Sequence, residues 1–314
     1  MSKWQYTRGL HKIGNGIYAY LQPDGSWGLN NAGLIVDGEH SMVVDTLYDL
    51  DLTQEMLEAM QAATNAAESI DILVNTHVNG DHCFGNQLFK GAEIIASNAC
   101  AGEFATETPP QLMIDMLKAA PQMGELGTFF TKCFGKFNFE GITLTPPTKT
   151  FENRLDISVG EKEINLIEVG PCHTRGDIMV YIPGDRILFA GDVLFIEGTP
   201  IMWDGPLANW MRALDQIIGM DVETIVPGHG PVTDKNGVES MKAYWQWVDT
   251  EARKRYDAGM PAAEAAKEML AGPYSAWGDP ERIVINLDAL YREFAGDSTP
   301  ANRVELLGIM AKLV

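Results

Sequence analysis

The sequence has few basic residues for its length. Among 314 residues, 23 are lysine or arginine and 43 are aspartate or glutamate, which gives a formal net charge of −20. Proteins that bind nucleic acids or anionic membranes use clustered basic side chains to reach phosphates. The densest basic stretch, residues 253–255, lies among acidic residues on an expected helix. We therefore expect a small-molecule partner, with no nucleic acid and no membrane.

Cysteine and long apolar runs are also scarce. The four cysteines form no Cys-x-x-Cys pair and are too few for a disulfide framework. No apolar run approaches the roughly 20 residues of a membrane span, and the first residues have no apolar signal-peptide core. We expect a cytoplasmic protein with reduced thiols.

The remaining composition, 46% hydrophobic and 21% charged, is that of an ordinary globular protein. Two strand-rich halves each end in a helix and a strand, which indicates a duplicated unit. Strands this apolar on both sides are buried when two sheets face each other with helices outside. The expected strands are 17–21, 32–36, 41–45, 70–74, 93–96, 163–169, 178–182, 187–190 and 224–226, with helices at 51–67 and 207–218.

Two regions interrupt this pattern. Residues 101–148 combine a helix that begins at Pro109–Pro110 with a phenylalanine-rich segment, which we interpret as an insertion over a site, with core packing as the alternative. Residues 238–314 are expected to be helical, with helix starts at Asp279–Pro280 and Thr299–Pro300. We expect this tail to be a subdomain or a dimer-forming extension without catalytic chemistry, and a homodimer.

Histidine is rare, yet four of the six histidines follow expected strands, next to glycine and aspartate. Glycine beside a ligand lets the backbone turn sharply, so that side chains can converge on one point. Imidazole and carboxylate ligands without thiolates suit Zn²⁺, and also Mn or Fe, in a catalytic site with open positions. A single histidine is usually structural, but this combination predicts a metal centre. The predicted ligands are His77, Asp81, His82, His173, Asp192 and His229.

The order of these motifs resembles the metallo-β-lactamase superfamily. It runs His-x-Asn-x-Asp-His from residue 77, His-Thr-x-Gly-Asp from 173, Gly-Asp at 191 and Pro-Gly-His-Gly from 227. The resemblance implies an α/β fold, an αββα four-layer sandwich over residues 1–237, followed by a helical C-terminal extension over 238–314. By position it also implies a first metal site with His77 and His173, a second with Asp81, His82 and His229, and Asp192 as the bridge.

One residue departs from the family pattern, because Asn79 stands where a histidine is usual. An amide oxygen is a weak ligand beside imidazole. We therefore expect one tightly held Zn²⁺ at the second site and a weak or vacant first site. In the alternative, Asn79 orients a metal-bound water and both sites fill.

The expected activity is metal-dependent hydrolysis, in which a metal-bound hydroxide attacks a carbonyl. Asp81 and Asn79 are the expected catalytic residues, while Thr76 or Asp177 could hold the imidazoles in the right tautomer. The substrate is expected to be a small, largely apolar or aromatic ester, lactone or β-lactam. The alternatives are hydrolytic dehalogenation of a chlorinated aromatic such as chlorothalonil, a non-catalytic binding protein, and an iron-dependent oxidoreductase.

The segment 198–210 follows Asp192 and is rich in aromatic and Met residues, which suggests an apolar pocket wall. From it we single out Trp203 and Asn209 as substrate-binding residues, with ordinary packing as the rival explanation. Arg175 could pair with a substrate carboxylate or form a structural salt bridge. The excess negative charge favours neutral, apolar substrates.

Overall fold

The computed structural model describes residues 4–106 and 108–314. Its strands form a seven-stranded sheet in the order β1-β2-β3-β4-β5-β6-β7 and a five-stranded sheet in the order β12-β11-β10-β9-β8. The strands are β1 (Gly9–Gly14), β2 (Ile17–Leu21), β3 (Ala32–Asp37), β4 (His40–Val44), β5 (Ile72–Val74), β6 (Glu93–Ser97), β7 (Lys149–Phe151), β8 (Arg154–Val159), β9 (Lys162–Glu168), β10 (Ile178–Ile182), β11 (Ile187–Phe189) and β12 (Thr224–Val226).

Each sheet changes from antiparallel to parallel pairing along its width. β1 to β4 pair antiparallel and β4 to β7 pair parallel, while β8 to β11 pair antiparallel and β11 pairs parallel with β12. The tight turn before β2 needs Gly16, whose φ of +66° disfavours any residue with a Cβ. The parallel strands β5, β11 and β12 bring the segments that follow them to one edge of the two sheets.

Successive side chains of the strands point to opposite faces of each sheet and pack in different layers of the core. Met42 and Val44 of β4 join the apolar cluster between the sheets, and Ile178 and Val180 of β10 join it from the other sheet. The residue between the first two, Val43, packs in a separate cluster with α1 (Leu50–Ala63). The period of two is that of strands with both faces buried.

The outer face of the second sheet is covered by helices. Met179, Leu188 and Ile225 share a cluster with Leu214 and Ile217 of α6. Helices therefore lie outside both sheets, and the αββα sandwich expected from the sequence is confirmed. The other helices are α2 (Gly80–Cys83), α3 (Asn98–Glu103), α4 (Pro110–Ala119), α5 (Gly124–Phe134), α6 (Leu207–Gly219), α7 (Lys235–Asp257), α8 (Ala262–Met269), α9 (Ile283–Ala295) and α10 (Arg303–Met310), with 3₁₀ turns η1 (Asn65–Glu68), η2 (Asn86–Leu88), η3 (Ala120–Gln122), η4 (Gly191–Val193) and η5 (Pro280–Arg282).

The two expected helix starts in the tail lie differently in the structure. Asp279 has a φ of +50° and makes no capping bond, so Pro280 opens only the 3₁₀ turn before α9. The last helix, α10, begins at Arg303, and the Asn302 side chain caps it by accepting from the Glu305 N–H. Thr299–Pro300 therefore precedes the helix without starting it.

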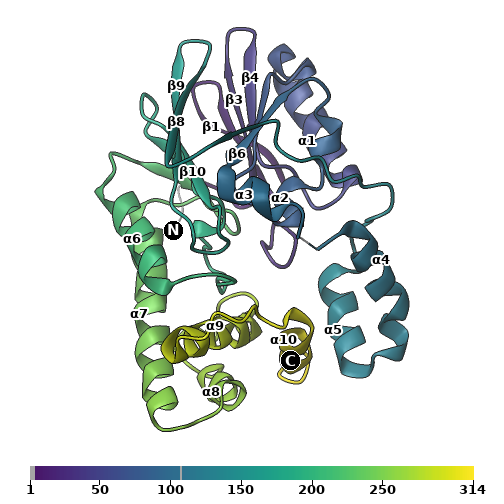
Figure 1. Cartoon of the computed structure of the whole chain (residues 1–314). Helices are drawn as coiled ribbons and strands as arrows, with labels where there is room; N and C mark the ends of the chain where they lie inside the picture. The colour runs from purple at the N-terminus through teal and green to yellow at the C-terminus, as the bar shows by residue number, and fades with distance from the viewer. Residues whose placement is uncertain (1–3, 107) are drawn as a thin grey trace.

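The insertion and the C-terminal helices meet on the same side of the sandwich. Figure 1 shows α4 and α5 beside one end of the sheets, α9 and α10 below the sheets, and α7 along the other flank. The last helix, α10, contacts α5 directly, and α9 packs on α7 and α8. Across the described residues, no helix combines the length and apolar character needed to span a membrane.

Candidate metal centre

The segments that follow five strands converge at one sheet edge. Asp45 follows β4, and the motif that begins at His77 follows β5. His173 lies in the connection between β9 and β10, Asp192 follows β11, and His229 follows β12. All five side chains are buried, with exposed fractions of 0 to 4%. The sequence prediction that strand ends gather these groups agrees with this arrangement.

The carboxylate of Asp192 lies at the middle of the imidazoles. Its Oδ1 is 3.2 Å from His82 Nε2, and its Oδ2 is 3.4 Å from both His173 Nε2 and His229 Nε2. His77 Nε2 lies 3.8 Å from the same Oδ2. The Asp81 carboxylate approaches His229 Nε2 to 3.4 Å.

Three of these atoms have no hydrogen-bond partner among the described residues, although they are buried. They are His77 Nε2, His82 Nε2 and Asp192 Oδ1. Leaving such atoms unpaired in the interior costs about 1–3 kcal/mol each, and a cation would satisfy all three. The donor atoms fall into two groups, one of His77, His82 and Asp192 and one of Asp81, His82 and His229. The residues present therefore fit a divalent metal such as zinc.

A ring of buried acceptors sets the orientation of the imidazoles. Asp45 Oδ2 lies 2.9 Å from His82 Nδ1, and the Thr76 N–H and hydroxyl each donate to the Asp45 carboxylate at 2.7 Å. The Gly25 carbonyl lies 3.0 Å from His229 Nδ1. These acceptors hold the proton on Nδ1, so the Nε2 lone pair can face a metal.

We expect Asp45→Asn to weaken metal affinity about 10- to 100-fold, because it removes the charge that orients His82. Competition with a chromogenic chelator measures this affinity. Asp71→Asn is the matched control, because Asp71 makes the same kind of contact with His40, at 3.3 Å, on the surface. Equal affinities in the two variants would contradict a positioning role for Asp45.

Charge in the cluster is balanced between carboxylates and imidazoles. Burial alone would lower the pKa of His229, but the Asp192 and Asp81 carboxylates outweigh it and raise that pKa to about 9. Burial similarly opposes charge on His82, yet Asp192, Asp45 and Asp81 raise its pKa well above the usual value. For His77, burial dominates and the pKa falls. Protons and a metal therefore compete for the same lone pairs, and metal affinity should rise with pH.

The Asn79 side chain contacts Nε2 of His173, the ring nitrogen that a metal at the first site would need. Its side-chain oxygen lies 2.7 Å from His173 Nε2, and the Ile201 carbonyl lies 2.6 Å from Nδ1. Two acceptors require a doubly protonated ring, whereas a turned-over amide would donate to a neutral ring. Burial lowers the pKa of His173 and favours the neutral ring. In both arrangements Asn79 uses Nε2, and His173 joins neither ligand group of the described residues.

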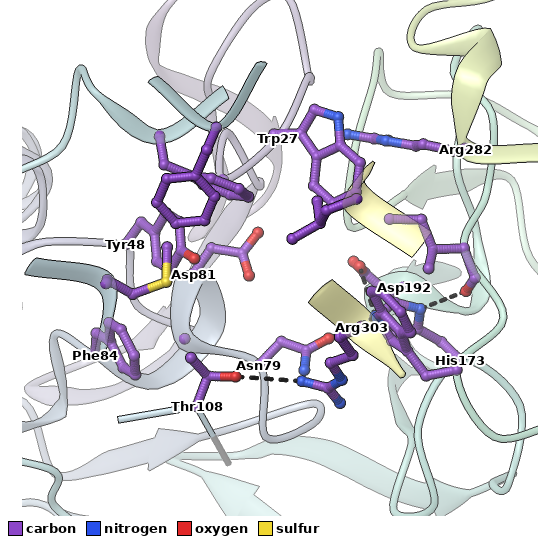
Figure 2. Close-up of a pocket in the computed structure, with 18 of the residues that line it drawn as sticks. Trp27, Tyr48, Asn79, Asp81, Phe84, Thr108, His173, Asp192, Arg282 and Arg303 are labelled. Atoms are coloured by element: carbon purple, nitrogen blue, oxygen red, sulfur yellow. Dashed lines mark hydrogen bonds and ion pairs between the residues drawn. The ribbon is translucent and has the colours of Figure 1, made fainter. Parts of the chain in front are cut away.

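A cavity of about 200 Å³ opens onto this cluster. Asn79, Asp81, His173, Asp192 and His229 form its floor. Figure 2 shows Tyr48 and Phe84 on one side of these residues and Trp27 beside Arg282 on another. Much of the remaining wall is apolar and comes from the insertion and the C-terminal tail: Leu112, Met113, Met116, Phe130, Phe134, Val304 and Leu307. The tail therefore lines the site, although none of its described residues belongs to the two ligand groups.

The three expected substrate-binding residues lie in different places. Trp203 lines the cavity. Arg175 is 66% exposed and ion-pairs with Asp204 at 3.1 Å, and it does not belong to the cavity lining. Asn209 accepts a hydrogen bond from Arg212 on α6 and is also absent from the lining. Asp177 contacts no imidazole in the described chain; it accepts from Thr174 and so braces the loop that carries His173.

Sequence reasoning missed Trp27, Tyr48, Arg282 and Arg303. Trp27 and Tyr48 lie in connections that flank β3 and β4, and the two arginines lie more than 200 residues further along the chain. For Tyr48 a signal existed, since it follows Asp45 at the same strand end. For the arginines we find no local signal, because their approach to the site depends on how the tail packs.

The fold and the cluster together define an αββα protein with a histidine and carboxylate centre at its sheet edge. The family model for the metallo-beta-lactamase superfamily matches residues 25–229. This chain belongs to that superfamily.

The curated relatives are more informative about chemistry than about the substrate. The alpha subunit of a 2,4-dinitroanisole O-demethylase from Nocardioides sp. (strain JS1661) is 34% identical over 86 residues, 27% of this chain and 26% of that protein. An acyl-coenzyme A thioesterase from Bos taurus is 26% identical over 63% of this chain and 72% of its own. The mitochondrial hydroxyacylglutathione hydrolase of Saccharomyces cerevisiae is 26% identical over 71% and 67%. The chain spans only about a quarter of the demethylase subunit. The two longer matches are to hydrolases, which supports a hydrolase.

Solved structures share the fold at low identity. A metallo-beta-lactamase from Pontibacter korlensis has a TM-score of 0.56 at 18% identity and covers 76% of this chain and 99% of its own. The sec-alkylsulfatase Pisa1 from Pseudomonas sp. has a TM-score of 0.66 at 15% identity and covers 95% of this chain and 52% of its own. The second match extends beyond the sandwich into the helical tail.

Proposed function

We propose that this protein is a metal-dependent hydrolase, with zinc as the metal, acting on a small and largely apolar ester, thioester or lactone. The observation that carries the proposal is a buried cluster beneath an apolar cavity, in which His77 Nε2, His82 Nε2 and Asp192 Oδ1 have no hydrogen-bond partner within the described part of the chain. When bound, a divalent metal supplies a Lewis acid and lowers the pKa of coordinated water to roughly 7. One relative is named an acyl-coenzyme A thioesterase and another a hydroxyacylglutathione hydrolase, which supports a hydrolytic reaction and the inclusion of thioesters.

The chain's own residues divide the work between holding the metal and shaping the substrate site. Asp81, His82 and His229 would hold the metal, and Asp192 would share it. Asp81 is 15% exposed and borders the cavity, so its carboxylate can orient a nucleophile and accept a proton. Tyr48, Phe84 and the other apolar walls exclude water and bind the body of the substrate.

A single tightly held metal is the stoichiometry that the geometry supports. Asn79 engages His173 Nε2, so the first site expected from the resemblance would have to break this contact to gain His173 as a ligand. Among the described residues, the printed contacts of His82 Nε2, His229 Nε2 and the Asp81 carboxylate are with other members of the cluster and not with a neutral side chain. We therefore place the metal there.

We expect Asn79→His to raise the metal content from about one to about two ions per chain, because a new imidazole replaces the amide that blocks His173. Elemental analysis of protein purified without chelators measures this ratio. Asn236→His, at the exposed start of α7, is the control for histidine added elsewhere. Two ions in the unchanged protein would contradict the single-metal assignment.

The function is tested by metal analysis joined to a substrate panel. The panel contains chromogenic esters, thioesters, lactones, a cephalosporin, a chlorinated aromatic and an electron-poor aryl ether. The last two are included because the cavity wall is rich in aromatic rings and one relative is named for an aryl ether. We expect ester or thioester turnover that chelation abolishes and zinc restores. Metal-replete protein that turns over no panel member would refute the proposal.

A further inference from the structure

Two half-exposed apolar side chains lie at the mouth of the cavity. Within residues 4–106 and 108–314, three large hydrophobic side chains are exposed: Leu112 at 47%, Val304 at 52% and Val314 at 59%. Leu112 of α4 and Val304 of α10 both line the cavity, whereas Val314 does not. Single apolar side chains scattered over a surface are normal, but two that gather at the mouth of one cavity indicate a binding surface.

A contact between the starts of two helices brings these side chains to the same place. Thr108 lies just before α4 and Arg303 is the first residue of α10, and Arg303 Nη1 donates to the Thr108 hydroxyl at 3.4 Å (Figure 2). The last helix, α10, also contacts α5. The insertion and the tail therefore share one rim of the cavity, and we call Leu112 and Val304 the rim pair.

An apolar strip leads from the rim pair into the cavity. Leu112 and Met116 lie one turn apart on α4, and Val304 and Leu307 lie one turn apart on α10, so each two share a helix face. All four line the cavity, and Met116 and Leu307 are half-buried. Further lining residues have exposed fractions of 7% or less: Met113, Phe130 and Phe134. Burial therefore increases from the rim pair inwards while the strip stays apolar.

The cavity is too small to enclose a long chain. Since an apolar cavity of about 150 Å³ holds one benzene molecule, a cavity of about 200 Å³ encloses on the order of six to eight carbon atoms. A longer unbranched chain whose reacting end lies at the predicted ligands would leave the cavity over the rim pair. Apolar side chains at that point would keep the outer part of the chain partly out of water.

The rim pair is too small a surface for a protein partner. Polar side chains border it on both helices: Gln111 donates to Asp115 at 2.8 Å beside Leu112, and the exposed Glu305 follows Val304. A stable protein interface buries roughly 800 Å² on each partner, which is far more than two half-exposed aliphatic side chains offer. A narrow apolar chain fits this surface better than a second copy of the protein.

We propose that the rim pair binds the far end of a long, unbranched apolar chain, so that the preferred substrates are long-chain esters or thioesters rather than short or compact ones. The ester or thioester at the reacting end rests on the proposed hydrolytic function, whereas binding of the chain requires no turnover. A fully buried methylene raises affinity about fourfold, and one that is half covered at the rim raises it about twofold. Leu112 and Val304 therefore determine specificity for chain length without touching the reacting atoms.

The test measures the binding of straight-chain methyl ketones, from pentan-2-one to dodecan-2-one, by calorimetry on the zinc-loaded full chain. These ligands carry a carbonyl but cannot be hydrolysed. The double variant Leu112→Gln, Val304→Thr nearly keeps the size of both side chains and removes their apolar character. We expect it to bind dodecan-2-one roughly 5- to 20-fold more weakly than the unchanged protein and pentan-2-one within about twofold. Val314→Thr is the matched control, because Val314 is equally exposed but lies outside the cavity lining.

Three other outcomes would overturn the proposal. Equal weakening of short and long ketones would show that the substitutions disturb the cavity as a whole. Affinity that stops rising at about eight carbon atoms in the unchanged protein, or that rises equally in both proteins, would show that the chain does not use the rim pair. Dimerisation that light scattering detects in the unchanged protein and not in the double variant would make the rim pair an interface between copies.

Failure of the hydrolytic function is a separate result. The ketone series can be measured with or without bound zinc and on protein that turns over no panel substrate. If the double variant selectively loses affinity for the long ketones under those conditions, the assignment of the rim pair stands while the proposed hydrolysis fails.

Discussion

Asp81→Ala is expected to lower kcat/KM by about 10³-fold or more while the protein stays folded. The variant removes a carboxylate that lies 3.4 Å from His229 Nε2 and 3.8 Å from His82 Nε2, and so one ligand of the proposed metal site. The loss of metal and of its charge stabilisation is worth several kcal/mol in the transition state. Kinetics on the best panel substrate, metal content and circular dichroism give the three measurements.

A carboxylate on the surface is the control for this variant. Asp156 of β8 is exposed, pairs with Arg154, and belongs neither to the ligand groups nor to the cavity lining. Asp156→Ala should keep both metal and activity. If Asp81→Ala retained full turnover with its metal bound, Asp81 would have neither the ligand role nor the proton-accepting role proposed for it.

Trp210→Ala is expected to lower the free energy of unfolding by about 3–5 kcal/mol, the usual cost of removing a buried tryptophan side chain. Trp210 of α6 is fully buried, and its ring centre lies 4.8 Å from that of Trp245 on α7. Its Nε1 donates to the Val193 carbonyl at 2.8 Å, next to Asp192. Urea unfolding followed by circular dichroism measures the change, with the slope of the transition compared between variants.

Trp210→Phe separates packing from the hydrogen bond. It keeps a ring against Trp245 but leaves the Val193 carbonyl without its donor, so we expect a smaller loss, about 1–3 kcal/mol. A loss below about 1 kcal/mol for Trp210→Ala would contradict the view that this contact joins α6 and α7 to the site loop.

The layered fold could be predicted because its signal is local. Expected strands at 17–21 and 178–182 coincide with β2 and β10, since alternation and apolar content directly reflect burial on a sheet. The convergence of the predicted ligands was likewise visible, because each of them follows a strand. The assignment of these residues to two metal sites could be predicted less well. The resemblance joins His77 with His173, whereas the donor atoms group His77 with His82 and Asp192.

The cavity wall could not be predicted, because it depends on contacts between distant segments. The side chains of Trp203 and Arg303 are in contact although 100 positions separate them. Periodic patterns in the sequence predict helices and strands, but they do not predict contacts between segments this far apart. A position close to a predicted ligand in the sequence was also misleading, because it did not predict a place in the cavity wall. Arg175 is only two residues from His173, yet the turn between them directs it to Asp204 and the solvent.

The helices α4, α5 and α10 supply much of the wall but none of the predicted ligands. Evolution, or a directed-evolution library restricted to these helices, can therefore retune substrate range while the sheet edge stays intact. A library built on the loops that carry the predicted ligands would instead risk the loss of metal binding with each substitution. The helical tail also lies outside the segment that the superfamily model matches, so changes confined to α10 leave that segment unaltered.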